Sequence, residues 1–228
     1  MGAFNFITTK KIDEAYKYER FFGLIIYGDQ GVGKSTYMLK VLYDVYGDWD
    51  IVFEHIIFSF DDLIDLIKKT REMSKRNERI KVIGWDDAGI YGHKYIYFRK
   101  REAVELVSAW IDVVRTRIAS ILITTINPFN LLKPIRESTG FKFGKVVRLN
   151  KDDDRQITVY NRTILPNCKT YVKKMYVDTF TARLPDNIYS RYLEMRKKFY
   201  EVAEARLVEI AEKGVDEKEL NKVPLPED

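Results

Sequence analysis

The sequence predicts an α/β fold of three layers, with a central, mostly parallel sheet between helices. Apolar strand-like runs alternate with helix-like stretches between residues 21 and 127, and such short alternation favours a parallel sheet covered on both faces. The 228 residues, 46% of them hydrophobic, suffice for one domain with a small addition and a real core. After residue 140 the pattern becomes strand-rich and ends in one long helical stretch, so extra C-terminal strands and a long C-terminal helix are expected.

The first half of the chain supplies two strands and two helices. Residues 21–28 are apolar, partly β-branched and end in glycine, which is typical of a buried strand. A glycine-rich turn leads to a predicted helix over 34–47, which Gly47 ends. Residues 50–60 are predicted as a second strand. Ser59 is then a suitable cap for a helix whose first turn carries acidic residues.

The next predicted elements complete the alternation. Residues 79–85 form an apolar run that indicates a third strand, and residues 101–117 have the apolar spacing of a helix. Residues 120–127 indicate a fourth strand, which is followed by a short segment over 129–138. The predicted order is therefore an alternation of strands and helices that contains four strands.

The C-terminal part differs in texture. Residues 143–150 and 155–161 are strand-like and flank an acidic turn, which predicts a hairpin, and 170–180 predicts a further strand. Residues 185–214 indicate one long helix with Asp186 as its cap. The predicted divisions are a core at 1–140, a strand-rich extension of the core sheet at 141–185, the helix at 186–214 and a flexible tail at 215–228.

The stretch "GDQGVGKST" between the first strand and the first helix matches the pattern G-x-x-x-x-G-K-[ST]. Glycines let backbone N–H groups turn inward around phosphates, and the following helix presents its N-terminus to the anion. Lys34 is expected to reach the β- and γ-phosphates, and the Ser35 hydroxyl to bind Mg²⁺. Here the chain resembles the P-loop NTPases. The expected nucleotide contacts are Gly28, Asp29, Gln30, Gly31, Val32, Gly33, Lys34, Ser35 and Thr36.

Two acids follow the third strand and allow two interpretations. In an ATPase, Asp86 holds Mg²⁺ through water and Asp87 orients the attacking water. Many ATPases have glutamate at the second position, whereas initiator- and loader-type AAA+ proteins resemble this sequence in using adjacent aspartates. ATP and Mg²⁺ are the cofactors that this interpretation implies.

The same letters contain Asp86-x-x-Gly89, the spacing with which small GTPases sense a γ-phosphate. Asn150-Lys151-x-Asp153 also matches their guanine-recognition motif. A GTP-binding switch protein therefore stays open as an alternative.

Three features favour the ATPase. Thr70 is the only candidate switch threonine in the window before the acids, and the charged residues there do not supply two strands. The stretch after the guanine-like motif is strand-like, although GTPases have a helix there. The fourth strand ends in Thr124, Thr125 and Asn127, which resembles ASCE-class ATPases, where a strand between the two phosphate-site strands ends in a polar sensor. Asn127 is the predicted sensor.

ASCE motors usually work as rings in which an arginine of one subunit completes the neighbouring site. A guanidinium stabilises the charge on the transferring phosphoryl group, by about 10³–10⁵ in rate. Arg136 follows the sensor at the expected interval, and Arg115 and Arg117 are second choices. A homo-oligomer is therefore expected.

A basic and aromatic loop follows the acids at residues 92–102. Cations bind phosphates and aromatic rings stack on bases, so the mixture indicates contact with DNA. Segment 133–185 also has twelve Lys and Arg against five Asp and Glu, a local net charge of +7. The predicted nucleic-acid contacts in the loop are Lys94, Tyr95, Tyr97, Arg99, Lys100 and Arg101.

Together, "GDQGVGKST", "WDDAG" and "TTINP" followed by "LLKPIRE" resemble compact ATPases of archaeal viruses and plasmids. These are similar to AAA+ initiator or loader ATPases and, more distantly, to FtsK/HerA motors. The strands at 141–180 fit FtsK/HerA better than the helical lid of AAA+ proteins, but the FtsK/HerA sensor is usually glutamine. The resemblance implies an oligomeric ATPase that moves, packages or replicates DNA.

A third hypothesis is an ATPase that acts on protein, as a loader or secretion factor, with the C-terminal helix as the contact. The single cysteine, Cys168, favours a reducing compartment. The sequence has neither a run of roughly 20 apolar residues nor a secretory signal. A cytoplasmic location, in the host cell if the chain is viral, is the expectation.

Overall fold

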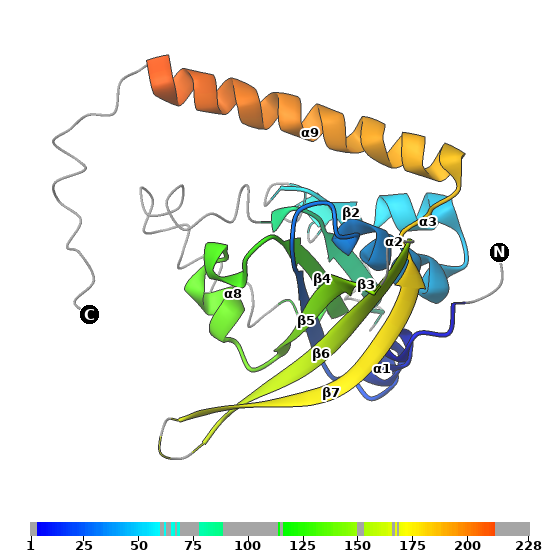
Figure 1. Ribbon diagram of the computed structural model, residues 1–228, viewed down its shortest axis with the longest axis vertical. Coiled ribbons are helices and arrows are strands. Elements are labelled where there is room, and N and C mark those ends of the chain that lie inside the picture. Colours follow the sequence, from blue (N-terminus) through cyan, green and yellow to red (C-terminus); the bar gives the residue numbers. More distant parts are fainter. Residues whose placement is uncertain are drawn as a thin grey trace, which may run out of the picture. The chain divides into compact units, whose positions relative to one another are not determined.

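The computed structural model describes residues 4–59, 62, 65–66, 68, 78–88, 114, 116–149, 153–165, 167 and 169–212. The chain divides into two compact units, Met1–Leu184 and Pro185–Asp228. The first unit contains a seven-stranded sheet with helices packed against it, and the second contains one long helix (Figure 1).

The sheet has the strand order β2-β3-β4-β1-β5-β6-β7. The first five strands in this order, β2, β3, β4, β1 and β5, run parallel to one another, whereas β6 and β7 continue the sheet in antiparallel pairing. The predicted α/β fold, with a mostly parallel sheet and additional C-terminal strands, is therefore confirmed. The strands are β1 (Phe22–Tyr27), β2 (Ile56–Ile57), β3 (Ile80–Trp85), β4 (Ile118–Thr125), β5 (Phe141–Arg148), β6 (Asp154–Ile164) and β7 (Thr170–Thr181).

Helices lie on both faces of the sheet. A Cβ on Gly84 of β3 would lie 2.8 Å from the sulfur of Met38, so α2 packs on that face. Ile83 and Trp85 point to the opposite face, since side chains alternate along a strand, and they share a buried cluster with Ile135. The sheet is thus the middle of three layers. The elements of the first unit that flank it are α1 (Ile7–Lys17), α2 (Lys34–Tyr46), α3 (Trp49–Glu54), the 3₁₀ turn η1 (Pro128–Asn130) and α8 (Lys133–Glu137).

The strand predicted over 50–60 is wrong in its first half. The Asp48 side chain accepts hydrogen bonds from the backbone N–H groups of Asp50 and Ile51. This cap starts α3, and only Ile56 and Ile57 pair with β3. A good N-cap residue therefore outweighed the apolar, β-branched pattern that favoured a strand.

Helix α1 was not predicted from the sequence. Its start is held by Asp178 of β7, whose carboxylate accepts the N–H groups of Ile7 (2.8 Å) and Thr8 (3.1 Å). Asp44 of α2 accepts the N–H of Phe4 at 2.7 Å and the hydroxyl of Thr9 at 2.7 Å. Acceptors from distant parts of the chain supply the cap that the local sequence lacks.

The second unit is built around α9 (Asp186–Glu212), 27 residues long with Asp186 in its first turn. Along it, Lys197 pairs with Glu201, and Arg196 donates to the hydroxyl of Tyr200 at 2.6 Å. These are spacings of four residues, which place both partners on one side of a helix. The predicted long C-terminal helix is confirmed. None of the described helices combines the length and apolar character needed to cross a membrane.

Candidate functional site

The loop between β1 and α2 turns sharply at glycines. Gly28 has φ +149°, and a Cβ there would lie 2.7 Å from the Val146 carbonyl oxygen of β5. Gly33, which caps α2, has φ +99° in the left-handed region. A side chain at Gly28 would press on backbone that cannot give way, and at both positions L-residues are strained. The glycines that the motif requires thus have a steric reason here.

Lys34 begins α2 and folds back over the loop. Its ammonium donates hydrogen bonds to the carbonyl oxygens of Gly28, at 2.9 Å, and Asp29, at 2.8 Å. Lys34 is buried, so its charge is held at the centre of the loop. This position suits a cation that would meet the terminal phosphates of a nucleotide.

Asp86 follows β3 and is fully buried beneath the loop. One of its carboxylate oxygens, Oδ1, accepts hydrogen bonds from the Ser35 hydroxyl at 2.7 Å and the Thr124 hydroxyl at 2.6 Å. Ser35 comes from α2 and Thr124 from β4. Side chains from these two elements therefore meet the residue that follows β3 at one carboxylate oxygen. They meet because β3, β4 and β1 are neighbours whose carboxyl ends share one edge of the sheet.

Asp87 has φ +46°, a left-handed conformation unusual for a residue other than glycine. Its N–H donates to the Thr124 hydroxyl at 2.8 Å. Thr124 therefore accepts from one aspartate and donates to the other. Strained backbone of this kind collects at functional sites, where surrounding contacts hold it in place.

The residues present fit a magnesium ion. The Ser35 hydroxyl and the Asp86 carboxylate bring two oxygen ligands together, and oxygen is what Mg²⁺ prefers. Among the described residues, no group of three or more His, Cys, Asp or Glu side chains could hold a metal by itself. A magnesium ion at a nucleotide site would take one or two protein oxygens, with phosphates and water completing its shell.

Asn127 follows β4 but does not reach the two aspartates through any hydrogen bond described here. Its side-chain oxygen accepts the Phe129 N–H at 3.0 Å and caps η1. The strand-end residue that contacts both aspartates is Thr124, which the sequence had marked as polar but not as the sensor. The role of Asn127 as sensor stays a prediction.

Arg136, on α8, is held against η1. Its guanidinium donates to the Phe129 carbonyl at 3.1 Å and lies over the Phe129 ring. A cavity of about 730 Å³ opens between this arginine and the phosphate loop. Half of the residues that line it are cationic or aromatic, namely Tyr27, Phe129, Arg136, Phe143, Lys145, Tyr160 and Arg162. The other half are Gly28, Asp29, Ile126, Asn127, Pro128, Glu137 and Val172.

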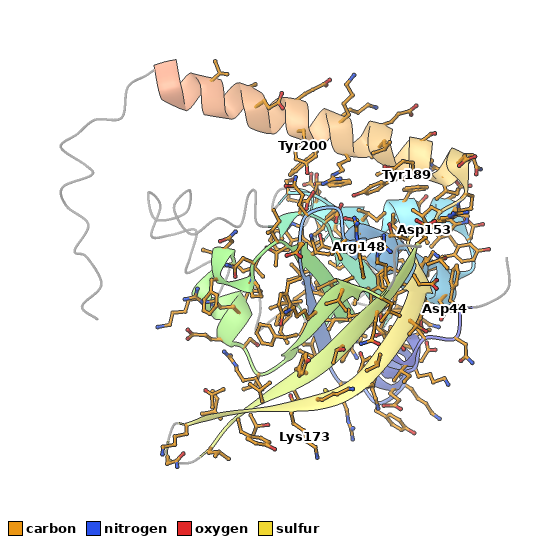
Figure 2. The ribbon with its side chains drawn as sticks, viewed as in Figure 1. Asp44, Arg148, Asp153, Lys173, Tyr189 and Tyr200 are labelled. Carbon is orange, nitrogen blue, oxygen red and sulfur yellow. The ribbon has the colours of Figure 1, made fainter. Side chains whose placement is uncertain are left out.

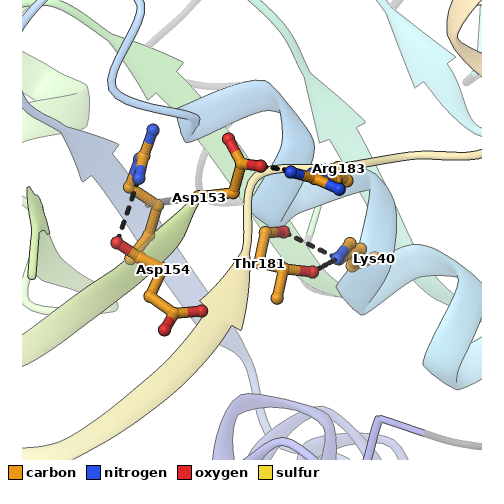
Figure 3. Close-up of polar contacts among 6 residues, drawn as sticks. Lys40, Asp153, Asp154, Thr181 and Arg183 are labelled. Atoms are coloured by element: carbon orange, nitrogen blue, oxygen red, sulfur yellow. Dashed lines mark hydrogen bonds and ion pairs between the residues drawn. The ribbon is translucent and has the colours of Figure 1, made fainter. Parts of the chain in front are cut away.

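Arg155, at the start of β6, is a contact that sequence analysis missed. It is buried, and its Nε donates to the Val32 carbonyl of the phosphate loop at 3.2 Å. Nearby, Asp153 pairs with Arg183, and Lys40 of α2 donates to the Thr181 carbonyl and hydroxyl at 2.6 and 2.8 Å (Figure 3). The start of β6 and the end of β7 are thus hydrogen-bonded to the loop between β1 and α2 and to α2, respectively. No local motif marks Arg155, because its partner lies 123 residues away.

Tyr37, in the first turn of α2, joins the same side of the site to β7. Its hydroxyl donates to Asp178 at 2.7 Å and lies 2.6 Å from the Thr8 hydroxyl. Burial raises the pKa of Tyr37 well above its ordinary value, and the Asp178 carboxylate raises it further. The phenol therefore stays protonated and available as a donor.

Several predicted residues lie outside the described part of the chain. These are Thr70, Gly89, Arg115, Asn150, Lys151, Cys168, the loop contacts Lys94, Tyr95, Tyr97, Arg99, Lys100 and Arg101, and the predicted tail at 215–228. Most of the predicted helices after Ser59 and at 101–117 also lies outside the described residues. Of the guanine-like motif, Asp153 is described, and it is followed directly by strand β6 rather than by a helix.

Comparison with known proteins gives two viral relatives. No protein-family model matches the chain. The uncharacterized protein ORF286 of Acidianus two-tailed virus is 28% identical over 160 residues, which are 69% of this chain and 54% of that protein. A KaiC-like protein of Pyrococcus horikoshii OT3 is 15% identical, with 69% of this chain and 92% of that chain covered. Its TM-score of 0.33 is too low to support an argument from that structure.

The uncharacterized protein B-251 of Sulfolobus spindle-shape virus 1 is 31% identical over 207 residues. The alignment covers 84% of this chain and 80% of that protein. The chain belongs to the same protein family as B-251 of Sulfolobus spindle-shape virus 1.

Proposed function

We propose that the chain is a magnesium-dependent P-loop ATPase of the ASCE class that works on DNA as an oligomer. The observation that carries the proposal is the convergence of Ser35, Asp86 and Thr124 on one carboxylate oxygen beneath the phosphate loop. In this proposal ATP lies with its phosphates on residues 28–36, and the DNA is translocated, packaged or replicated at the expense of ATP.

Each residue of the site takes a role that its position supports. Lys34 and the loop N–H groups neutralise the β- and γ-phosphates. Ser35 and Asp86 hold Mg²⁺, which supplies charge stabilisation to the transferring phosphoryl group when it is bound. Asp87 accepts a hydrogen bond from the attacking water and orients it in line with the γ-phosphate.

The strand order favours an ATPase over a GTPase switch. Strand β4 lies between β1, which carries the phosphate loop, and β3, which carries the aspartates. A strand in this place, ending in a polar residue, is the feature by which the sequence resembles ASCE ATPases. The strand β6 directly after Asp153 is a second point against guanine recognition.

Arg136 is the proposed arginine that acts in a neighbouring subunit. In the single chain its guanidinium is occupied by the Phe129 carbonyl and ring, so it would have to leave η1 to reach a phosphate elsewhere. Mixing inactive Lys34→Ala chains with Arg136→Ala chains tests this. Recovery of turnover in the mixture supports action in trans, whereas full activity of Arg136→Ala alone contradicts it.

The direct test of the function is hydrolysis of ATP and GTP, with and without duplex DNA. We expect turnover that requires Mg²⁺, prefers ATP, and falls by several orders of magnitude in Lys34→Ala and Asp87→Asn. Asp13→Asn, a half-exposed aspartate of α1, is the matched control and should hydrolyse ATP as the wild type does. A preference for GTP by orders of magnitude would contradict the ATPase, and no effect of DNA would contradict the DNA role.

The same site could serve an ATPase that remodels protein, with α9 as the contact. The described surface of α9 includes exposed Tyr189 and Leu193, which is the observation in its favour. Stimulation by a protein client but not by DNA in the same assay would select it.

A further inference from the structure

Strands β6 and β7 run on past the rest of the sheet as a two-stranded ribbon. Strand β5 pairs with β6 only as far as Tyr160. The pairing of β6 with β7 continues from Asn161 opposite Lys173 to Ile164 opposite Thr170. We call the described residues of this ribbon, 161–165, 167 and 169–174, the arm; it extends away from the other strands in Figure 1, and Figure 2 shows Lys173 on it.

Beyond Arg162, the arm is exposed on both faces. Every described residue from 163 to 175 is exposed, including Ile164 at 51%, Tyr171 at 56% and Val172 at 56%. A two-stranded hairpin is at best marginally stable by itself in water. An arm that presents apolar side chains on a protruding ribbon is therefore built to contact something else.

The charge of the arm identifies the class of partner. Between Asp154 and Asp178 the sequence has no acidic residue at all, so the arm carries positive charge that nothing of opposite sign within it balances. Lys173 pairs with Asn161 and Lys174 with Tyr160, so the two lysines, being adjacent, point to opposite faces. The basic residues in this stretch are Arg155, Arg162, Lys169, Lys173 and Lys174.

We infer that the arm binds double-stranded DNA by entering a groove, without sequence specificity. The major groove is about 12 Å wide and admits a two-stranded β-ribbon. Lysines on both faces then meet the phosphates of both groove walls, and such contacts carry no sequence information. Binding to a polyanion requires a surface without acidic residues that would repel it, whereas binding to a protein surface has no such requirement.

The base of the arm reaches the candidate site. Arg162 lies over the Phe143 ring and, with Tyr160, lines the cavity that Gly28 and Asp29 also line. DNA held on the arm would thus lie next to the phosphate loop. The inference rests on the proposed function only for this coupling, because binding to DNA itself needs no ATP.

The test is fluorescence anisotropy of the full chain with a labelled duplex of mixed sequence, without nucleotide, at several salt concentrations. The variant is Lys173→Ala with Lys174→Ala, and the matched control is Lys10→Ala with Lys17→Ala, two exposed lysines of α1. We expect the slope of log K against log salt to flatten by about 2 in the arm variant. Its affinity should fall roughly 10- to 100-fold at 0.1 M salt, while the control binds as the wild type does.

Two results would overturn the inference. One is equal affinity and equal salt slope in the wild type and the arm variant. The other is no binding of duplex by the wild type together with a change of sedimentation in the arm variant, which would make the arm a contact between copies. ATP turnover by the wild type separates the two proposals: if the wild type binds DNA through the arm but hydrolyses no ATP, the arm stands and the ATPase fails.

Discussion

Thr124 is the residue through which the two aspartates after β3 are tied to the sheet. Its hydroxyl donates to Asp86 and accepts from the Asp87 N–H. A threonine at this point of a strand costs nothing in strand propensity, and it supplies both a donor and an acceptor. One hydroxyl therefore fixes the orientation of the proposed metal ligand and the strained backbone of the proposed catalytic acid.

Replacing Thr124 by valine should impair turnover while the fold survives. We expect kcat to fall on the order of 10- to 100-fold and the Mg²⁺ concentration needed for half-maximal rate to rise, because residues that orient metal ligands have effects of this size. Unfolding should become easier by about 1–3 kcal/mol, since Asp86 loses a buried donor. The control is Thr125→Val, whose hydroxyl donates to a carbonyl outside the aspartate pair. A normal Mg²⁺ requirement in Thr124→Val would contradict the positioning role.

The raised pKa of Tyr37 should make the stability of the fold depend on pH in the alkaline range. Its pKa in the folded chain is raised by burial and by Asp178, whereas an unfolded tyrosine ionises near pH 10. The stabilisation from the buried phenol is complete below about pH 10 and is lost as the pH rises toward the folded pKa. We expect the unfolding free energy to decline above about pH 10, by up to about 1.4 kcal/mol per pH unit from this group.

Urea titrations at several pH values check this, with Tyr37→Phe as the comparison. The variant should be less stable at neutral pH because it lacks the hydrogen bond to Asp178, but should lose less on going above pH 10. Ionised Tyr37 contributes to the absorbance at 295 nm in the wild type but not in Tyr37→Phe. This contribution should appear only as the wild type unfolds. Identical alkaline profiles of both proteins would show that Tyr37 is not the responsible group.

At the scale of elements, α1 depends on side chains from far along the chain. Asp44 accepts the N–H groups of Phe4, Asn5 and Phe6 and the hydroxyl of Thr9. Asp178 accepts two more N–H groups. The helix therefore forms as part of the tertiary structure rather than by its own propensity.

Asp44→Ala should loosen α1 selectively. Hydrogen bonds to a charged group are worth about 1.5–3 kcal/mol each, and this carboxylate is partly exposed, so we expect a loss of about 2–3 kcal/mol in unfolding free energy. Amide exchange should accelerate in residues 4–17. Asp48→Ala, which removes the cap of α3, should cost about 1 kcal/mol and change exchange near residues 49–54 instead. Unchanged exchange in α1 would show that Asp178 alone holds it.

What the sequence could predict follows from how local each signal is. The strands β1, β3 and β4 and the phosphate loop are continuous stretches with their own pattern, and they were predicted within a few residues. The short β2 was obscured by the cap at Asp48, and α1 by its distant acceptors. Arg155 and Thr124 contribute through hydrogen-bond partners that are far away in the sequence, and the spacing of residues along the chain does not reveal such partners.

At the scale of the whole chain, the order of the strands is what assembles the site. Strands β3, β4 and β1 are neighbours although residues 28–117 separate β1 from β4 in sequence. The sequence predicted a parallel sheet and, by resemblance, the place of β4. It did not predict that β6 and β7 would be bonded to the phosphate loop or that their ribbon would run on beyond the sheet. The predicted domain divisions and the roles of individual site residues stay predictions.

The bonds between α2 and β7 have a mechanical consequence. Tyr37 and Lys40, one turn apart on the helix that begins at the phosphate loop, grip Asp178 and Thr181 of β7. Strand β6 holds β7 in the sheet as far as Lys174, which lies opposite Tyr160, the last residue of β6 that pairs with β5. Only the ribbon beyond that point lacks a third strand, and from Lys173 to Thr170 it spans about 10 Å. A displacement of the first turn of α2 would therefore spread through the paired strands before it reached the arm.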